Sequence, residues 1–314
     1  MRIRGESVVR EINGRDGPSF ANPRCMIHFG TAGWLYKDWE GIVYPSPKPR
    51  GFDPLEFIAR FFTTVEINST YYAPAKAATA VKWIERISDF PDFRFTAKMW
   101  KRFTHERTTA WKRDEVKEVR AAFDKLHEAG RLGAVLLQFP WSFRRTDENR
   151  EWLDDVTHTF GMYPLVLEVR HESWNTPEFY AGLSDRGIGF VNIDQPLFSR
   201  SIKPSASVTS SVGYIRVHGR NYKDWFRKGA GVEARYDYLY SAEELKPWAK
   251  RAKEIAAVAE ETYVVTNNHY KGKAAANAVM LEALTGGKKA AAPASLVEEY
   301  PDELARYARP VRPA

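Results

Sequence analysis

The strongest constraint on the fold is an alternation that repeats along most of the chain. A short apolar run rich in β-branched residues is followed each time by a longer stretch with helical spacing. Several apolar runs are almost continuous, which is typical of strands buried on both faces of a parallel sheet. We expect eight such strands, at residues 27–29, 64–67, 93–97, 134–138, 165–169, 189–193, 213–217 and 262–266.

Capping residues indicate where helices begin between these runs. Asp53 and Thr176 each precede a proline, the arrangement of an N-cap followed by proline at the first helical position. Ser241 and Glu244 have the spacing of a capping box. Residues 194–211 contain two prolines and many serines and lack helical spacing, so we expect an irregular loop between the sixth and seventh strands.

Eight strand–helix units over roughly 260 residues match an α/β (β/α)8 TIM-type barrel in a single domain. The main alternative is a doubly wound open sheet, which usually begins with a glycine-rich G-x-G-x-x-G turn. The first turn here, at residues 30–34, lacks that spacing. We therefore expect a barrel over residues 27–287, a loose N-terminal extension at 1–26 and a peripheral C-terminal tail at 288–314.

Composition limits the compartment and the partners. The chain has 314 residues, one cysteine and a formal net charge of +7. A disulfide framework within the chain is excluded, and no apolar run approaches the roughly 20 residues of a membrane span. The polar N-terminus does not resemble a secretory signal, so we expect a cytoplasmic protein with no membrane association. Met26 directly precedes the first strand and is an alternative start to Met1.

Polar or ionisable side chains occur where every predicted strand ends. Active sites of TIM-type barrels lie at this end of the strands, and so dense a ring of polar groups must pair internally and enclose water or a ligand. We take Glu66, Glu168 and His218 as candidate catalytic residues. The candidate substrate-binding residues are Trp34, Tyr36, Asn68, Tyr71, Lys98, His105, Gln138, Arg170, Asp194, Arg216, Asn267 and Asn268.

The segment LEVRHESW at residues 167–174 contains a carboxylate and a guanidinium two positions apart. Strand side chains alternate between faces, so Glu168 and Arg170 point in the same direction. Pairing with Arg170 would lower the pKa of Glu168 and make it a weaker base. The segment therefore looks more like a device that positions a polar ligand than a free catalytic carboxylate, and proton transfer by the enzyme stays open beside binding.

The ends of the seventh and eighth strands favour an anionic ligand. Phosphate sites of such barrels usually lie there, and Arg216, His218 and Arg220 alternate along the seventh run, with a helix N-terminus near Lys273. We expect a small anionic ligand, phosphorylated or sugar-like, whose apolar face stacks on the aromatic candidates. An enzyme of this kind would be a hydrolase, lyase or isomerase that uses carboxylate acid/base chemistry.

Other functions remain open. A divalent metal could bind Glu168, Asp194 and His218, as in sugar-isomerase-like barrels, but Asn268 stands where those proteins have a further carboxylate. We expect no cofactor, with a metal as the weaker alternative. The basic and aromatic run at residues 98–113 is weak support for a nuclease-like, nucleic-acid-processing protein. A non-catalytic ligand-binding protein is the third possibility.

Seven ordered motifs resemble those of the DUF72 (YecE-like) family and together span most of residues 27–285. The resemblance implies a TIM-type barrel, in agreement with the strand pattern. It implies no activity and supplies no catalytic residues, because the family has no assigned function. The motifs are GTAGWLYKDWEGIVYP (30–45), FFTTVEINSTYY (61–72), FRFTAKMWKRFTH (93–105), LLQFP (136–140), LEVRHESW (167–174), YIRVHGRN (214–221) and TNNHYKGKAAANA (266–278).

Overall fold

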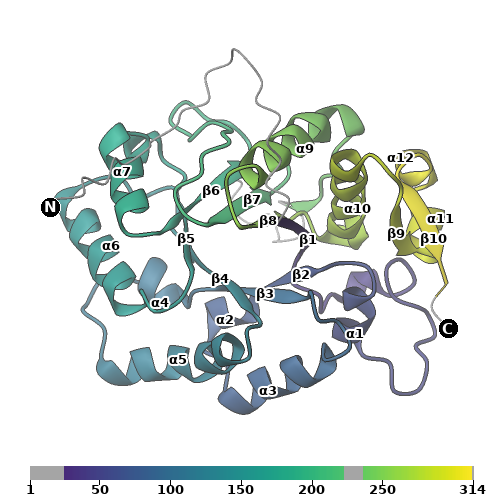
Figure 1. The fold of residues 1–314 in the computed structure, drawn as a ribbon, viewed down its shortest axis with the longest axis horizontal. Helices are drawn as coiled ribbons and strands as arrows, with labels where there is room; N and C mark the ends of the chain where they lie inside the picture. The colour runs from purple at the N-terminus through teal and green to yellow at the C-terminus, as the bar shows by residue number, and fades with distance from the viewer. Residues whose placement is uncertain (1–24, 223–235, 313–314) are drawn as a thin grey trace, which may run out of the picture.

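The eight predicted strands form a closed parallel barrel in chain order (Figure 1). The computed structural model describes residues 25–222 and 236–312. The barrel closes where the first strand pairs with the eighth, from Met26 beside Glu261 to Thr31 beside Thr266. The TIM-type barrel is thus confirmed. Its strands are β1 (Met26–Ala32), β2 (Thr64–Ile67), β3 (Arg94–Lys98), β4 (Leu132–Gln138), β5 (Leu165–Glu168), β6 (Gly189–Asp194), β7 (Val212–Val217) and β8 (Glu261–Thr266).

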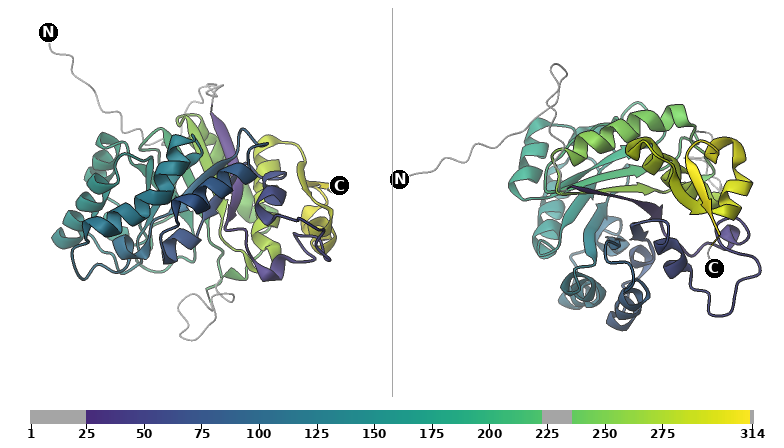
Figure 2. Two further views of the ribbon diagram at one scale, coloured as in Figure 1. Left: turned by 90° about the horizontal axis from the view of Figure 1, so that it is seen from below. Right: turned by 45° about the vertical axis from the view of Figure 1, so that its right-hand side comes forward.

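Helices surround the barrel on its outer side (Figures 1 and 2). The three predicted caps are confirmed: Asp53 accepts hydrogen bonds from two backbone amides, and Thr176 and Ser241 from one each. The principal helices are α1 (Pro54–Ala59), α3 (Ala77–Arg86), α5 (Arg113–Glu128), α6 (Asp147–Thr159), α7 (Pro177–Asp185), α9 (Ala242–Ala256) and α10 (Lys273–Gly286). Shorter turns are α2 (Ser69–Tyr72), α4 (Lys101–Thr104) and the 3-10 segments η1 (Lys37–Trp39), η2 (Glu172–Trp174) and η3 (Tyr270–Gly272).

The connection between β6 and β7 contains no helix, as predicted for residues 194–211. Asn192 of β6 binds this loop through its amide oxygen. The oxygen accepts hydrogen bonds from Ser205 Oγ and from the backbone amide of Ser207, at 2.7 and 2.8 Å. None of the helices within residues 25–222 and 236–312 combines the length and apolar character needed to cross a bilayer.

Two apolar cores lie on opposite sides of the strands. The larger is between the strands and the helices, and the smaller fills the barrel with side chains such as Leu136, Val166 and Val265. Gly30 permits the close approach of β1 to β2, since a Cβ there would lie 1.8 Å from the carbonyl oxygen of Thr64. The floor of the barrel is therefore packed, and open space can form only toward the strand ends.

The C-terminal segment after Gly287 is folded against α10 (Figure 2). It forms a parallel two-stranded sheet from β9 (Ala290–Pro293) and β10 (Ala308–Val311), connected by α11 (Ala294–Glu299) and α12 (Pro301–Leu304). Leu296 and Leu304 are fully buried. The sequence pattern predicted no element here, because alanine-rich strands of four residues lack the β-branched character that marks the barrel strands. Residues 1–24 of the expected N-terminal extension lie outside the described residues.

Candidate functional site

Arg216 at the end of β7 joins two buried carboxylates inside the barrel. Its Nη2 donates to Glu66 Oε1 at 2.7 Å, and its Nη1 donates to Glu168 Oε2 at 2.5 Å. Arg216 is 2% exposed and both glutamates are 0% exposed. The hydroxyl of Tyr214 donates to the second oxygen of Glu66 at 3.0 Å. The carboxylates are buried together with a counter-charge and hydrogen bonds, which is the condition for keeping charges in a barrel interior.

The predicted pairing of Glu168 with Arg170 is confirmed. Arg170 donates to Glu168 Oε1 from Nε and Nη2, at 2.9 and 2.8 Å. Burial alone raises the pKa of Glu168, but the positive charges of Arg216 and Arg170 outweigh it and hold the pKa well below its usual range. Glu168 is therefore ionised at neutral pH and has no proton to donate as a general acid.

His218 is buried and neutral. Burial, followed by repulsion from the nearby arginines, outweighs the attraction of Glu168 and lowers the pKa of His218 to about 3. Its Nε2 lies 3.3 Å from Glu168 Oε1, and Asn267 Nδ2 lies 3.0 Å from its Nδ1. If the Asn267 amide donates to Nδ1, the proton sits on Nε2 and faces Glu168. His218 thus orients Glu168 and supplies no positive charge for an anion.

A cavity of about 370 Å³ opens above this cluster at the carboxyl ends of the strands. Arg216 and Lys98 line its charged part, and Asn68 and Asn267 add amides. Its volume is in the range of small-molecule sites. The remaining lining residues are Gly33, Trp34, Leu35, Tyr36, Ser69, Tyr71, Tyr72, Trp83, Tyr236 and His269.

Aromatic rings form the walls of the cavity, and each packs against a further aromatic ring. Tyr36 stacks on His269 at a centroid separation of 4.3 Å, and Trp34 meets Trp83 edge to face at 5.9 Å. Tyr71 contacts His105 edge to face at 5.0 Å. The predicted aromatic residues are therefore brought to one site, with an orientation fixed by ring packing.

Lys98 at the end of β3 has an unusual environment for a lysine. Its Nζ lies 3.9 Å from the centroid of the Tyr71 ring, and Lys98 forms no ion pair with a carboxylate of residues 25–222 or 236–312. Burial, followed by repulsion from Arg216, lowers the pKa of Lys98 to about 7. Glu66 and Glu168 attract the ammonium, but Arg216 and Arg170 compensate their charge. The amine is therefore partly unprotonated at neutral pH.

Three further predicted residues have other contacts. Gln138 donates to the carbonyl oxygen of Phe139 at 2.7 Å. Asp194 points away from the barrel interior and accepts from Arg220 Nε at 3.0 Å, and burial raises its pKa. Asn268 also points outward and donates to the carbonyl of Tyr238 at 2.7 Å. Asp194 and Asn268 are thus not brought to the cavity.

The metal hypothesis required Glu168, Asp194 and His218 to converge. They do not, because Ile193 occupies the inward position on β6 and turns Asp194 to the outer face. Within the described part of the chain, no group of three or more His, Cys, Asp or Glu side chains could hold a metal ion. His28 lies in the lower half of the barrel and stacks on Tyr263 at 4.9 Å.

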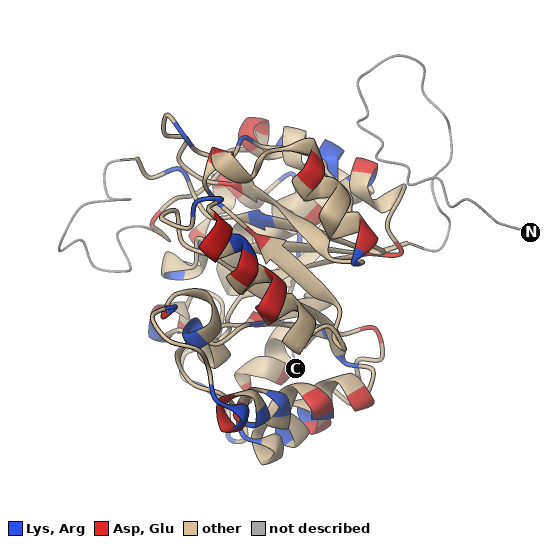
Figure 3. Ribbon diagram, turned by 90° about the vertical axis from the view of Figure 1, so that its left-hand side faces the viewer, with Lys and Arg blue, Asp and Glu red and all other residues tan. Residues whose placement is uncertain are grey.

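The basic and aromatic run at residues 98–113 packs into the protein. Phe103 is buried, and Trp111 meets Trp152 edge to face at 4.9 Å. Arg102 donates to Glu115 at 2.7 Å and to backbone carbonyls. On the face drawn in Figure 3, basic and acidic residues are interspersed. The run therefore offers no exposed aromatic platform of the kind that stacks nucleic-acid bases.

Some residues of the site were not among the candidates. Tyr214, which supports Glu66, lies two positions before Arg216 on the same face, so strand alternation could have identified it. Trp83 comes from the middle of α3 and Tyr236 from the connection before α9. No local pattern distinguishes these two from ordinary packing residues, and only the fold brings them to the cavity.

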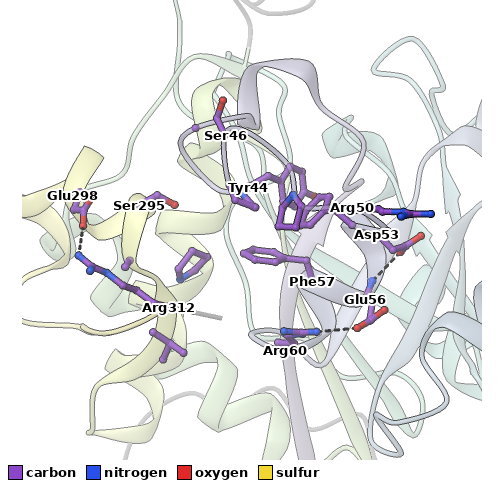
Figure 4. A pocket seen from close by; sticks show the side chains of 18 residues that line it. Tyr44, Ser46, Arg50, Asp53, Glu56, Phe57, Arg60, Ser295, Glu298 and Arg312 are labelled. Carbon is purple, nitrogen blue, oxygen red and sulfur yellow. Dashed lines mark hydrogen bonds and ion pairs between the residues drawn. The ribbon is translucent and has the colours of Figure 1, made fainter. Parts of the chain in front are cut away.

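A second cavity of about 630 Å³ lies on the flank, between the segment after β1 and the C-terminal unit (Figure 4). Tyr44 and Phe57 contribute its aromatic surface. Four of its charged side chains form two ion pairs, Glu56 with Arg60 at 2.9 Å and Glu298 with Arg312 at 3.5 Å. It shares no lining residue with the barrel-mouth cavity. Active sites of TIM-type barrels lie at the strand ends, so we take the barrel mouth as the candidate site.

Comparison with known proteins agrees with this architecture. Residues 28–301 match the family model described as a protein of unknown function, DUF72. The chain is 30% identical over 274 residues to the UPF0759 protein YunF of Bacillus subtilis, which covers 82% of this chain and 95% of YunF. It is 30% identical over 181 residues to the UPF0759 protein YecE of Escherichia coli K12, which covers 54% of this chain and 59% of YecE.

Among solved structures, a DUF72 family protein from Thermotoga maritima superimposes with a TM-score of 0.71 at 33% sequence identity. The match covers 83% of this chain and 99% of that chain. The resemblance seen in the seven sequence motifs is confirmed, and the chain belongs to the DUF72 family.

Proposed function

We propose that the barrel mouth binds a small anionic ligand, phosphorylated or sugar-like, between Lys98 and Arg216. One observation carries the proposal: two cationic side chains line a single cavity and still have capacity for an acceptor. Lys98 forms no ion pair within the described residues, and the buried Nε of Arg216 has no hydrogen-bond partner there. A buried donor without a partner is costly. An anion that accepts from Arg216 and pairs with Lys98 would give the Nε of Arg216 a hydrogen-bond partner and the ammonium of Lys98 a counter-charge.

The charges around the cavity support an anion over a cation. Glu66 and Glu168 are balanced by Arg216 and Arg170, which leaves Lys98 as an added positive charge. An anion next to Lys98 would raise the pKa of its ammonium above 7. Binding at neutral pH should therefore take up a fraction of one proton per site, and affinity should fall as pH rises above 7.

The walls of the cavity support a ligand with an apolar face. Tyr36 and Tyr71 offer ring surfaces, and Asn68 and Asn267 offer amides for hydroxyl groups. Rings with a few convergent polar groups are typical of sites that bind sugars or other polyols carrying a charged group. The low pKa of Glu168 makes it a poor general acid, so this proposal assigns Glu66 and Glu168 to positioning of the arginines.

Thermal-shift measurements test the proposal with inorganic phosphate, pyruvate, glucose 6-phosphate and glucose. The phosphorylated or carboxylated compounds should stabilise the wild type, and the same compounds should have little effect on Lys98→Met. Arg312→Met is the matched control, since Arg312 is an exposed cation at the second cavity. Equal stabilisation of wild type and Lys98→Met by every anion would contradict the proposal.

Isothermal titration in buffers of different ionisation enthalpy tests the proton linkage. With any anion that binds, the wild type should take up a fraction of one proton at pH 7. Binding without proton uptake would mean that Lys98 is not the group that pairs with the anion.

A further inference from the structure

We infer that Lys98 is a nucleophile that forms an imine with the carbonyl group of a small anionic aldehyde or ketone in the barrel-mouth cavity. The inference rests on the proposed function, because it names the chemical class of the ligand and adds a covalent step. It depends on three properties of Lys98, which are its place, its contacts and its protonation.

Lys98 is placed where an amine can meet a bound ligand. It occupies the last position of β3, two residues after Thr96, whose hydroxyl contacts Tyr214 inside the barrel at 2.8 Å. Alternation directs Lys98 to the same interior face, one layer nearer the mouth. Lys98 and Arg216 both line the cavity, so a carbonyl compound whose anionic group meets Arg216 would have its carbonyl carbon within reach of the amine.

The contacts of Lys98 leave its lone pair available. The Nζ atom faces the ring of Tyr71 at 3.9 Å, a contact that confines the amine without a strong acceptor. Lys101, three residues later in the chain, does have a strong acceptor. Its ammonium forms an ion pair with Glu106 at 2.7 Å on the surface.

The charges near Lys98 favour the reactive form of the amine. Only an unprotonated amine attacks a carbonyl carbon, and enzymes obtain one by burying a lysine beside another cation. Burial and the neighbouring Arg216 lower the pKa of Lys98 to about 7, so roughly half of the amine is unprotonated at pH 7 before a ligand binds. A bound anion lowers this fraction, and the amine that stays unprotonated is the form that reacts. The carboxylates that would otherwise hold the proton on Lys98 are engaged by Arg216 and Arg170.

The reaction needs no oxidant, reductant or metal. The Nζ lone pair forms a bond to the carbonyl carbon, and the π electrons of the carbonyl move to its oxygen. The nitrogen loses one proton and the oxygen gains one, which gives a neutral carbinolamine. A further proton, taken from solvent, lets the hydroxyl group leave as water while the nitrogen lone pair forms the C=N bond. The sum is amine, carbonyl compound and one proton giving a protonated imine and water.

Reductive trapping tests the inference. Wild-type protein is incubated at pH 7 with pyruvate, glyoxylate or dihydroxyacetone phosphate, reduced with sodium borohydride, and digested for peptide mass spectrometry. We expect one reduced adduct per chain with at least one probe, located on Lys98. Modification of Lys101 in the same digest is the internal control, and Lys98→Met and Lys98→Arg should abolish the specific adduct.

Lactate separates this inference from the proposed function, because it carries the same carboxylate as pyruvate without a carbonyl group. Stabilisation by both lactate and pyruvate with no adduct on Lys98 would overturn the inference and leave anion binding intact. An adduct level on Lys98 no higher than on Lys101 with all three carbonyl probes would also overturn it. If neither acid stabilises the protein and no adduct forms, both proposals fail.

Discussion

Replacing Lys98 by methionine should stabilise the protein at neutral pH, although it removes a side chain from the candidate site. Lys98 is held at a pKa of about 7, against an ordinary value of 10.5, chiefly because burial disfavours its charged form. Folding must therefore either bury an ammonium or release its proton, and both cost free energy. Methionine has a similar length and no charge to desolvate.

The magnitude follows from proton linkage. A difference of one pH unit in pKa corresponds to about 1.4 kcal/mol, so the fall at Lys98 sets an upper limit of about 5 kcal/mol. Lys98 lines a cavity that admits water, and methionine loses the contact of the ammonium with the Tyr71 ring. We therefore expect Lys98→Met to be more stable by about 2–3 kcal/mol at pH 7.

The pH dependence has a definite sign. Below pH 7 the folded and unfolded states both hold the proton on Lys98, and the full penalty is present. Between the folded pKa of about 7 and the unfolded pKa of 10.5, only the unfolded chain holds the proton, so the stability of the wild type rises with pH. Over this range the free energy of unfolding of the wild type should approach that of Lys98→Met. The difference between the two should shrink by about 2 kcal/mol between pH 7.5 and 9.5.

Urea denaturation followed by fluorescence at several pH values measures this gap. Titration of other groups cancels when the two proteins are compared at each pH. Lys101→Met is the matched control, because that ammonium is on the surface in an ion pair with Glu106, and it should not reproduce the narrowing expected of Lys98→Met. A gap for Lys98→Met that is constant from pH 7 to 9.5, or a less stable variant throughout, would refute the reasoning.

Four further substitutions test the scaffold by urea denaturation. Arg216→Met should cost about 3–5 kcal/mol at pH 7, because two buried carboxylates lose their shared cation; the loss should be smaller at pH 5, and a loss independent of pH would contradict this. Gly30→Ala should cost more than about 3 kcal/mol, since its Cβ would meet the carbonyl of Thr64 at 1.8 Å. Gly287→Ala is the comparison, because a Cβ there would have open space around it but the residue has a positive φ, and it should cost about 1 kcal/mol. Asp53→Ala should cost about 1 kcal/mol through loss of the α1 cap, and no change would mean that the cap is not stabilising.

Local sequence patterns were sufficient for the barrel itself. Near-continuous apolar runs identified all eight strands, and capping side chains such as Asp53 and Thr176 marked where helices begin. The pairing of Glu168 with Arg170 was also predictable, because two residues separated by one position on a strand share a face whatever the rest of the fold does.

The limits of such reasoning are seen at β6 and β8. Asp194 and Asn268 follow their strands just as the inward-facing residues do, yet both turn to the outer face. A change of one position reverses the face of a strand residue. Which position of a strand points inward depends on its register with the neighbouring strands, and a single polar residue at a strand end does not reveal it.

The electrostatic state of the site depends on contacts between residues of different strands. Glu66 and Glu168 both pair with Arg216, although their strands are far apart in the chain. These ion pairs neutralise the carboxylates that could otherwise have kept Lys98 protonated. Burial and the neighbouring charges set the protonation of Lys98 and His218. Local patterns in the sequence define which strands form and show that their ends are polar. Closure of the barrel decided which of those charges cancel, because pKa values depend on distances of a few ångströms between residues of different strands.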